Sequence, residues 1–304
     1  MEPSNLAVLI ASRNRSDKLL TLLRSINDNS ILPAQVIVIT SGEKKEISHL
    51  EFCKFNLVHH HVDFSGQVRQ KTFGLDFISK KIKWVLFLDD DVFLRKDFFA
   101  KVNLVTFDSS VLGYGLNHNI SHQKSFINHI HRVLQRKNLG KITRSSHAIS
   151  YVNSRADIEI KWANGLSIWS TSIINLYRLS LPSKSRDALE DVIFSYKVSK
   201  YGRLVFLKDI EVCSQEFAEQ PITFENYISS VYWRYYFVKN NEEFSVLFFL
   251  GYEFARAINF ILIGDRSISF FKKFIKTNLN LVELVYYVFS NKEPRDILFS
   301  KDLI

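Results

Sequence analysis

Short apolar runs alternate with helix-like segments through the first third of the chain, and this alternation constrains the fold more than any other feature. Four runs have strand length and are rich in β-branched or aromatic residues. Strands separated by helices pair in parallel through right-handed crossovers, which predicts an α/β fold with a mostly parallel central sheet flanked by helices. Such sheets bind ligands beyond the carboxyl ends of their strands. The four runs cover residues 6–12, 35–40, 56–62 and 83–89.

Two segments between these runs have the periodicity of amphipathic helices, and Ser16 or Asp17 can cap the first of them. Later in the chain we expect strands at 111–115, 150–154 and 202–212, and a helix at 187–202. The predicted buried faces of the two early helices are Leu19, Leu22, Leu23 and Ile26, and Val68, Thr72, Leu75 and Ile78.

Composition excludes several classes of protein. A hydrophobic content of 46% and a charged content of 23% are typical of an ordered globular chain, and 304 residues suffice for a sizeable core. Cys53 and Cys213 are isolated, so neither a disulfide framework nor a zinc cluster is expected, and a reducing, cytoplasmic compartment fits best. The N-terminus lacks the basic region and the long apolar run of a signal peptide.

The net charge of +9 suggests an anionic partner, such as nucleic acid, anionic lipid or a phosphorylated substrate. Residues 109–156 contain no Asp or Glu, and this basic segment is either a solvated face or an anion-binding one. It contains Lys124, Arg132, Arg136, Lys137, Lys141, Arg144 and Arg155, together with His122, His129, His131 and His147.

The composition shifts again after residue 240, so we expect one domain at 1–240 and a helical segment at 241–304. Residues 244–264 are almost continuously apolar, but Glu253 and Arg256 lie mid-segment, where each is costly in a bilayer unless they pair. An interfacial or buried helix is therefore favoured over a membrane-spanning one. The segment either docks on a membrane or completes the core.

Three consecutive aspartates, Asp89, Asp90 and Asp91, follow the fourth apolar run in WVLFLDDDVFL. Like charges this close repel one another, and a divalent cation would relieve the repulsion. Alternate side chains of an extended segment point the same way, so Asp89 and Asp91 can address one ligand while Asp90 faces elsewhere. Mg²⁺ or Mn²⁺ on one or two carboxylates leaves positions for phosphate oxygens, which favours a nucleotide diphosphate as ligand.

A second acidic pair, Glu190 and Asp191, lies in the first turn of the predicted helix at 187–202. The helix dipole stabilises negative charge there, and a carboxylate facing the ligand can act as general base toward a hydroxyl group. An acidic first turn is also ordinary helix chemistry. The pair faces the ligand if the helix packs inward Val192, Ser195, Tyr196 and Val198.

The order and spacing of these segments resemble the inverting GT-A glycosyltransferases of family 2 over roughly residues 5–240. Five motifs carry the resemblance. AVLIASRNRSDKLLTLLRSI resembles the opening strand and helix, GQVRQKTFGL the GxxxARNxGL motif, and FLDDDVFL the DxD motif. WANGLSIWSTSII resembles the acceptor-side segment, and LEDVIFSYKVSKYG the EDxxLxxRxxxxG motif.

On the donor side the resemblance implies that Asp89 contacts the ribose, and that Asp91 with Asp89 holds Mn²⁺ or Mg²⁺ against the diphosphate of a UDP- or dTDP-sugar. Arg69 would pair with that diphosphate. Further donor-side positions are Ser12, Arg13, Ser41 and Asp90.

On the acceptor side the resemblance implies that Asp191, or less favourably Glu190, deprotonates a hydroxyl group, which attacks the anomeric carbon and inverts its configuration. Residues 232–241, YWRYYFVKNN, resemble a YYxxRN segment of rhamnosyltransferase-like members. The implied acceptor is a lipid-linked or oligosaccharide glycan of bacterial surface polysaccharide, at the inner face of the cell membrane, and nucleic acid is not expected. Trp162, Asn164 and Gly165 would border the sugar and the acceptor.

The chain departs from the family at two points. VITSG stands where members often have VDDGS, so Thr40 and Ser41 replace an aspartate that commonly reads the base. Ser214 stands where many members have a histidine on the metal, and the run 59–61 of histidines is expected to be polar or core rather than a substitute.

Two alternatives stay open. A sugar nucleotidyltransferase would have a glycine-rich basic loop after the first strand, and ASRNRSDK has no glycine. A degenerate, non-catalytic basic protein that binds membrane or nucleic acid would leave the ordered carboxylates unexplained.

Overall fold

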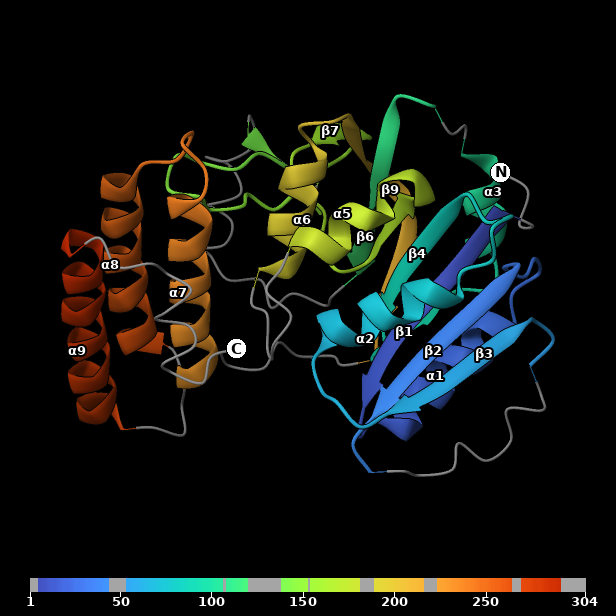
Figure 1. The fold of residues 1–304 in the computed structure, drawn as a ribbon, viewed down its shortest axis with the longest axis horizontal. Helices are drawn as coiled ribbons and strands as arrows, with labels where there is room; N and C mark the ends of the chain where they lie inside the picture. Colours follow the sequence, from blue (N-terminus) through green and yellow to red (C-terminus); the bar gives the residue numbers. More distant parts are fainter. Residues whose placement is uncertain are drawn as a thin grey trace. The chain divides into compact units, whose positions relative to one another are not determined.

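Among the described residues, nine strands form one sheet in the order β3-β2-β1-β4-β8-β6-β9-β5, with β7 paired to β9 (Figure 1). The computed structural model describes residues 5–43, 53–105, 108–119, 138–152, 154–180, 189–215, 223–263 and 269–290. The predicted α/β fold with a central sheet flanked by helices is confirmed. The strands are β1 Leu6–Arg13, β2 Gln35–Ser41, β3 Leu57–Val62, β4 Trp84–Asp89, β5 Val92–Leu94, β6 Val111–Asn119, β7 Ile158–Ile160, β8 Ser167–Ser170 and β9 Arg203–Ser214.

Strand β1 lies between β2 and β4 and is parallel to both. Its apolar residues are buried because helices cover both faces of the sheet, as an unbroken apolar run requires. The register sets Ser12 beside Thr40, and Ala11 beside Asp89. The strands β1, β2, β3 and β4 therefore end along one side of the sheet, at Arg13, Ser41, Val62 and Asp89, which we call the carboxyl edge.

The second half of the sheet is mixed. Strand β8 runs antiparallel between β4 and β6, and β6 is parallel to β9. Strand β5 pairs antiparallel with the end of β9, which sets Ser214 opposite Val92, next to the three aspartates. The strands predicted at 111–115 and 202–212 are confirmed as β6 and β9.

The strand predicted at 150–154 is wrong, because the described residues of that segment are irregular. Its apolar signal comes from Tyr151, which is fully buried against Trp162 and Phe206. The Tyr151 hydroxyl accepts the N–H of Asn164 at 2.7 Å. A single buried aromatic residue, Tyr151, therefore gave this segment the β-propensity of a strand.

Helices cover both faces of this sheet (Figure 1). Helix α1 (Ser16–Asn27) and helix α3 (Phe98–Leu104) pack on one face, and α2 (Gln67–Gly74), α5 (Ile174–Ser180) and α6 (Glu190–Val198) on the other. The predicted capping of α1 is wrong, because the residue before the helix is Arg15 and no side chain caps it. The predicted buried faces of α1 and α6 are confirmed.

The buried face predicted for α2 is confirmed at Val68 and Leu75 but not at its other two positions. Thr72 and Ile78 are only half-buried, whereas Lys71 is buried. Gly74 explains the difference, because a Cβ there would lie 2.4 Å from Leu9 Cδ1, so the helix approaches the sheet closely at this point. Lys71 faces inward as a result.

A second compact unit comprises residues 142–149, 184–189 and 219–304. It contains helices α7 (Phe224–Lys239), α8 (Val246–Ile263) and α9 (Phe270–Phe289), which contact one another. The boundary expected after residue 240 falls inside this unit, between α7 and α8, and the division into 1–240 and 241–304 stays a prediction. Within the described ranges, no helix is long and apolar enough to cross a membrane.

Charged residues of α7 and α8 pair inside the second unit. Glu253 is fully buried, and Arg256 Nη1 lies 2.8 Å from its carboxylate, which confirms the predicted pair. Arg234 Nε lies 3.2 Å from the same carboxylate, and Arg234 Nη1 donates to Ser146 O at 2.8 Å. In the segment that resembles YYxxRN, both Tyr235 and Tyr236 are buried on α7.

A substitution at Gly113 of β6 tests how closely the sheet packs next to α6. A Cβ there would lie 2.3 Å from the buried ring of Trp169, which itself packs at 4.6 Å on Phe194 of α6. We expect Gly113→Ala to lower the free energy of unfolding by about 1–3 kcal/mol, measured by urea denaturation. Gly251→Ala is the control, since nothing lies within 4 Å of its added Cβ on α8. It should raise the stability by up to about 1 kcal/mol, and equal effects at both positions would contradict the packing.

Candidate active site

Carboxylates from distant parts of the chain surround one buried ammonium group. The Lys71 side chain is 1% exposed, and its Nζ lies 3.7 Å from Asp89 Oδ1 and 3.6 Å from Glu190 Oε1. The positive charge of Lys71 also acts on Asp191 and lowers the pKa of its carboxyl group. The loop before β8 closes on this group, because a Cβ on Gly165 would lie 3.3 Å from Asp89 Oδ2. The structure thus brings together residues that the sequence analysis assigned to donor and acceptor sides.

Lys71 was not predicted as a site residue. The signal that could have found it is its spacing from Gln67, one helical turn earlier on the same face of α2. Gln67 Nε2 donates to Asp89 Oδ1 at 2.6 Å, so both side chains reach the end of β4. Arg69, the cation that we predicted, instead lies with its guanidinium 4.5 Å over the ring of Phe64. Its role toward a diphosphate stays a prediction.

The three aspartates divide between different partners. Asp90 is buried, accepts the Ser12 hydroxyl at 2.6 Å and accepts Arg15 Nη1 at 3.1 Å. The same Arg15 nitrogen donates to Asp91 Oδ2 at 3.1 Å. Asp90 therefore faces away from Lys71 and anchors β1 to the acidic turn, whereas Asp89 and Asp91 stay about one-third exposed, at 37% and 32%.

Gln215 fixes the backbone of the acidic turn and was also missed. Its N–H donates to Asp91 O at 2.8 Å, and its Nε2 donates to Val92 O at 2.7 Å and to Lys18 O at 3.0 Å. It follows Ser214, the position where the motif resemblance predicted a histidine on the metal. The end of β9 therefore supports the aspartates through an amide in this chain.

The acidic pair at the start of α6 has shifted proton affinities. Burial raises the pKa of Glu190 to about 7 and that of Asp191 to about 6; Lys71 acts against both shifts, and Asp89 adds to both. Asp191 Oδ1 also accepts the N–H of Val192 at 2.8 Å, which lowers its pKa. Carboxylates with such pKa values can take up a proton near neutral pH, as a general base must.

A small cavity lies among these groups. Asn164 and Gly165 line it, as predicted for the acceptor side, but Trp162 is not among its lining residues. Trp162 packs instead on Tyr151, with 5.0 Å between the rings. The polar side chains in the lining include Lys71, Asn164, Ser167, Tyr177, Glu190 and Asp191.

A second hollow lies at the ends of β1, β2 and β3. Ser12 and Ser41, both predicted to face the nucleotide, are buried and line it together with Thr40 and His61. Arg13, predicted beside them, is exposed and is not among the lining residues.

The histidines of β3 act as polar partners, as predicted. Thr40 Oγ1 lies 2.9 Å from His59 Nε2 and 3.2 Å from His61 Nδ1, and His60 stacks on Phe77 at 4.0 Å.

Much of the basic segment lies outside the described residues. Lys124, Arg132, Arg136 and Lys137 all fall in the range 120–137, for which no structure is described. An anion-binding role for residues 109–156 therefore stays a prediction.

The carboxylate oxygens of Asp89 and Asp91 suit a magnesium or manganese ion that is bound by a phosphate ligand as well. In the described part of the chain, no group of three or more His, Cys, Asp or Glu side chains could hold a metal ion. Asp89 and Asp91 are partly exposed oxygen donors, and Mg²⁺ commonly binds one or two carboxylates and completes its shell with phosphate oxygens and water. The residues fit an ion that arrives with a phosphate ligand.

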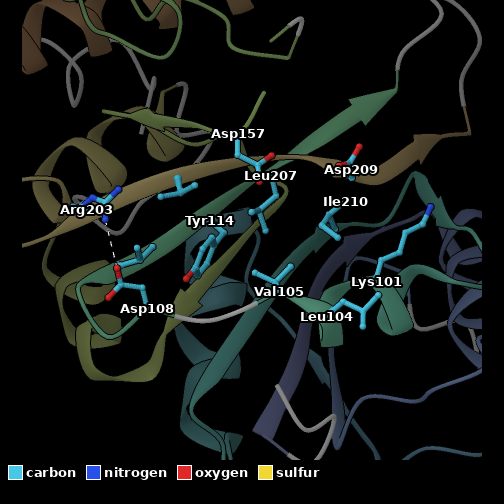
Figure 2. Close-up of a pocket in the computed structure, with 12 residues that line it drawn as sticks. Lys101, Leu104, Val105, Asp108, Tyr114, Asp157, Arg203, Leu207, Asp209 and Ile210 are labelled. Carbon is cyan, nitrogen blue, oxygen red and sulfur yellow. Dashed lines mark hydrogen bonds and ion pairs between the residues drawn. The ribbon is translucent and has the colours of Figure 1, made fainter. Parts of the chain in front are cut away.

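A larger cavity, of about 570 Å³, lies away from these residues, beside the end of α3 and on β6 and β9 (Figure 2). Its floor is apolar, with Val105, Tyr114 and Leu207, and at its rim Arg203 pairs with Asp108 at 3.4 Å. None of the predicted site residues lines it. Size alone does not define an active site, and convergent polar groups with shifted pKa values favour the smaller cavity at Lys71.

Comparisons with known proteins support the fold. No model of a known protein family matches the chain, and no curated protein matches its sequence. Among solved structures, S. aureus TarS 1–349 is similar, with a TM-score of 0.58 and 14% identity over 92% of this chain and 80% of that one. TarS 1–349 in complex with UDP-GlcNAc gives 0.55 and 15% over 85% and 75%, and its complex with UDP gives 0.55 and 16% over 86% and 76%. At such identities the likeness shows a shared fold.

Replacing Lys71 tests whether its charge controls the acidic pair. We expect Lys71→Met to raise the pKa of Glu190 by about one pH unit or more, because the nearest opposite charge is removed. Carboxyl-carbon NMR titration of wild type and variant measures this. Lys80→Met, at an exposed position, is the control and should leave the titration unchanged. An unaltered Glu190 titration in Lys71→Met would contradict the ion pair.

Proposed function

We propose that the protein is a glycosyltransferase that moves a sugar from a nucleotide-diphosphate donor to a hydroxyl group. The observation that carries the proposal is the half-buried acidic pair Glu190 and Asp191, of which Glu190 lies across Lys71 from Asp89 at the carboxyl edge of the sheet. In open α/β sheets this edge is where ligands bind. The fold shared with TarS 1–349, which was solved in complex with UDP-GlcNAc and with UDP, supports the same donor class.

The donor would lie along the carboxyl edge. The hollow lined by Ser12, Thr40 and Ser41 has hydroxyl groups that can hydrogen-bond a base and its ribose. Asp89, partly exposed beside that strand end, would accept from ribose hydroxyls. We propose a UDP- or dTDP-sugar, in keeping with the motif resemblance.

Asp91 and Asp89 would hold Mn²⁺ or Mg²⁺. Such an ion supplies positive charge to a departing diphosphate. The two carboxylates contribute negative oxygen ligands, and Arg15, which now bridges Asp90 and Asp91, would keep the acidic turn in place on its other side.

Asp191 is the proposed general base. Its carboxylate takes the proton of the acceptor hydroxyl while the hydroxyl oxygen forms a bond to the anomeric carbon. The bond from that carbon to the phosphate oxygen breaks, its electron pair leaves with the diphosphate, and the configuration inverts. Glu190 faces Lys71 and would serve as the electrostatic partner. Asn164 and Gly165, which line the small cavity beside the pair, would border the sugar.

The proposed acceptor is a lipid-linked or oligosaccharide glycan in bacterial surface polysaccharide synthesis, reached at the inner face of the cell membrane. Its support is the motif resemblance, including the rhamnosyltransferase-like segment at 232–241. The free Cys53 and Cys213 are compatible with a reducing compartment on that side.

Asp191→Asn tests the assignment of the base. In a panel of UDP- and dTDP-sugars with Mn²⁺ or Mg²⁺ and a lipid-linked glycan acceptor, wild type should release nucleotide diphosphate. The variant should lose about 10²- to 10⁴-fold in kcat, because an amide cannot take the proton, while the KM for the donor changes little.

Asp209→Asn is the matched control, since this aspartate is 80% exposed and lies outside the site, and it should keep full activity. Failure of every donor to turn over would contradict the transferase, and full activity of Asp191→Asn would contradict its role as base.

The pH profile tests the raised pKa values. The base must be ionised, so kcat/KM should fall about tenfold per pH unit as the pH drops below the Asp191 pKa of about 6, and should level off above it. Initial rates across a range of buffers at constant ionic strength measure this. A profile that stays flat from neutral pH down to the ordinary pKa of an aspartate would contradict a buried carboxylate base.

A further inference from the structure

Helices α8 and α9 carry apolar side chains on their exposed faces along their whole length. On α8 the large exposed side chains are Leu247, Phe248, Phe254, Ile258 and Leu262. On α9 they are Phe270, Phe271, Phe274, Ile275, Leu279, Val282, Val285, Tyr286 and Phe289. We call these residues together the α8/α9 face.

Several polar residues of the same helices face inward. Glu253 is fully buried with its two arginine partners, and Glu283 accepts hydrogen bonds from Tyr232 and Tyr287. Lys273, Thr277 and Asn280 are the buried polar side chains of α9. A helix on the surface of a water-soluble domain has the opposite polarity, with apolar residues inward and charged residues outward.

Charge is distributed unevenly over the exposed part of these helices. Among their described exposed side chains none is acidic, and Lys272 is the charged one. Lys276, one turn later, is half-buried, with its Nζ 5.0 Å from the ring centre of Phe224. The exposed side of these helices is therefore apolar, has lysines at one end and has no exposed acidic side chain. Such a surface complements one whose interior is apolar and whose boundary is anionic.

We propose that the α8/α9 face binds an anionic lipid bilayer, with both helices lying in the interface and the phenylalanines inserted below the headgroups. Aromatic and aliphatic side chains gain free energy when they leave water for the acyl boundary. Lys272 would remain at the headgroups, where anionic lipid attracts it. The face spans each helix, and 20 residues of α9 extend over roughly 30 Å, long enough for a broad contact in the interface plane.

A lipid surface fits this face better than a second protein copy does. Protein interfaces carry about one hydrogen bond per 100–200 Å². On the exposed part of α8 and α9 that the structure describes, Asn259 and Tyr286 are the uncharged side chains that could supply such bonds. A bilayer interior requires none. Contiguous exposed apolar area of this kind marks an interaction site in a soluble protein.

Vesicle co-sedimentation of the full chain tests the proposal without any donor or acceptor, so it is independent of the proposed function. Vesicles of equal parts phosphatidylglycerol and phosphatidylcholine are compared with vesicles of phosphatidylcholine alone. Wild type should pellet with the anionic vesicles and less with the neutral ones. The double variant Phe254→Glu with Phe271→Glu changes side chains that are 60% and 72% exposed. It should partition roughly a hundredfold more weakly, because two aromatic anchors are lost.

Tyr201→Glu is the matched control, since this side chain is 67% exposed and lies outside the second unit, in the unit of residues 1–141, 150–183 and 190–218, and it should bind like wild type. Circular dichroism and thermal unfolding check that each variant folds, and the milder Phe254→Ser with Phe271→Ser replaces any that does not. Wild type that stays in solution with both vesicles would overturn the proposal. Equal binding by the double variant would do the same. A lipid-free dimer that the double variant converts to monomer would assign the face to a second copy instead.

Discussion

The ammonium group of Lys71 is the contact on which the rest of the site depends. Placing the half-buried Glu190 and Asp191 near the partly exposed Asp89 costs free energy unless a cation offsets their desolvation and repulsion. Lys71 supplies that charge from α2, and in doing so it ties this helix to the end of β4 and the start of α6. The same ion pair keeps the acidic pair near neutral pKa values rather than higher ones. Structural support and proton affinity are therefore two effects of one contact.

Local patterns predicted the architecture well. The four apolar runs became the parallel half of the sheet, because strands covered on both faces must be apolar throughout. The buried stripe of α1 followed from helical periodicity, and the partnership of Glu253 with Arg256 from their spacing on one helix. Strand order also placed Asp89, Asp90 and Asp91 at the carboxyl edge. Each of these inferences uses residues that are close in sequence or a topological rule that needs no side-chain contact.

Features that depend on distant contacts could not be predicted in this way. Alternation along the strand predicted that Asp90 turns away from the ligand, but it could not predict the partners of Asp90, because Ser12 and Arg15 lie more than seventy residues away. Helix α2 turns Lys71 inward because Gly74 lets the helix approach Leu9, and hydrophobic spacing alone could not predict that a charged residue is buried there. Motif resemblance therefore pointed to Arg69, two positions away, as the cation of the site.

Hydropathy along the chain does not predict which side of an apolar helix faces water. In the second unit, the buried charged residues determine which side that is. In the sequence of α8, the charges of Glu253 and Arg256 argue against insertion across a bilayer. Arg234 of α7 joins them in one buried cluster, which a helix bundle tolerates because each charge has a partner. With the charges satisfied inside, the outward side of α8 is left with uncharged residues. The residues that argue against spanning a membrane are thus the ones that leave an apolar face free to lie on it.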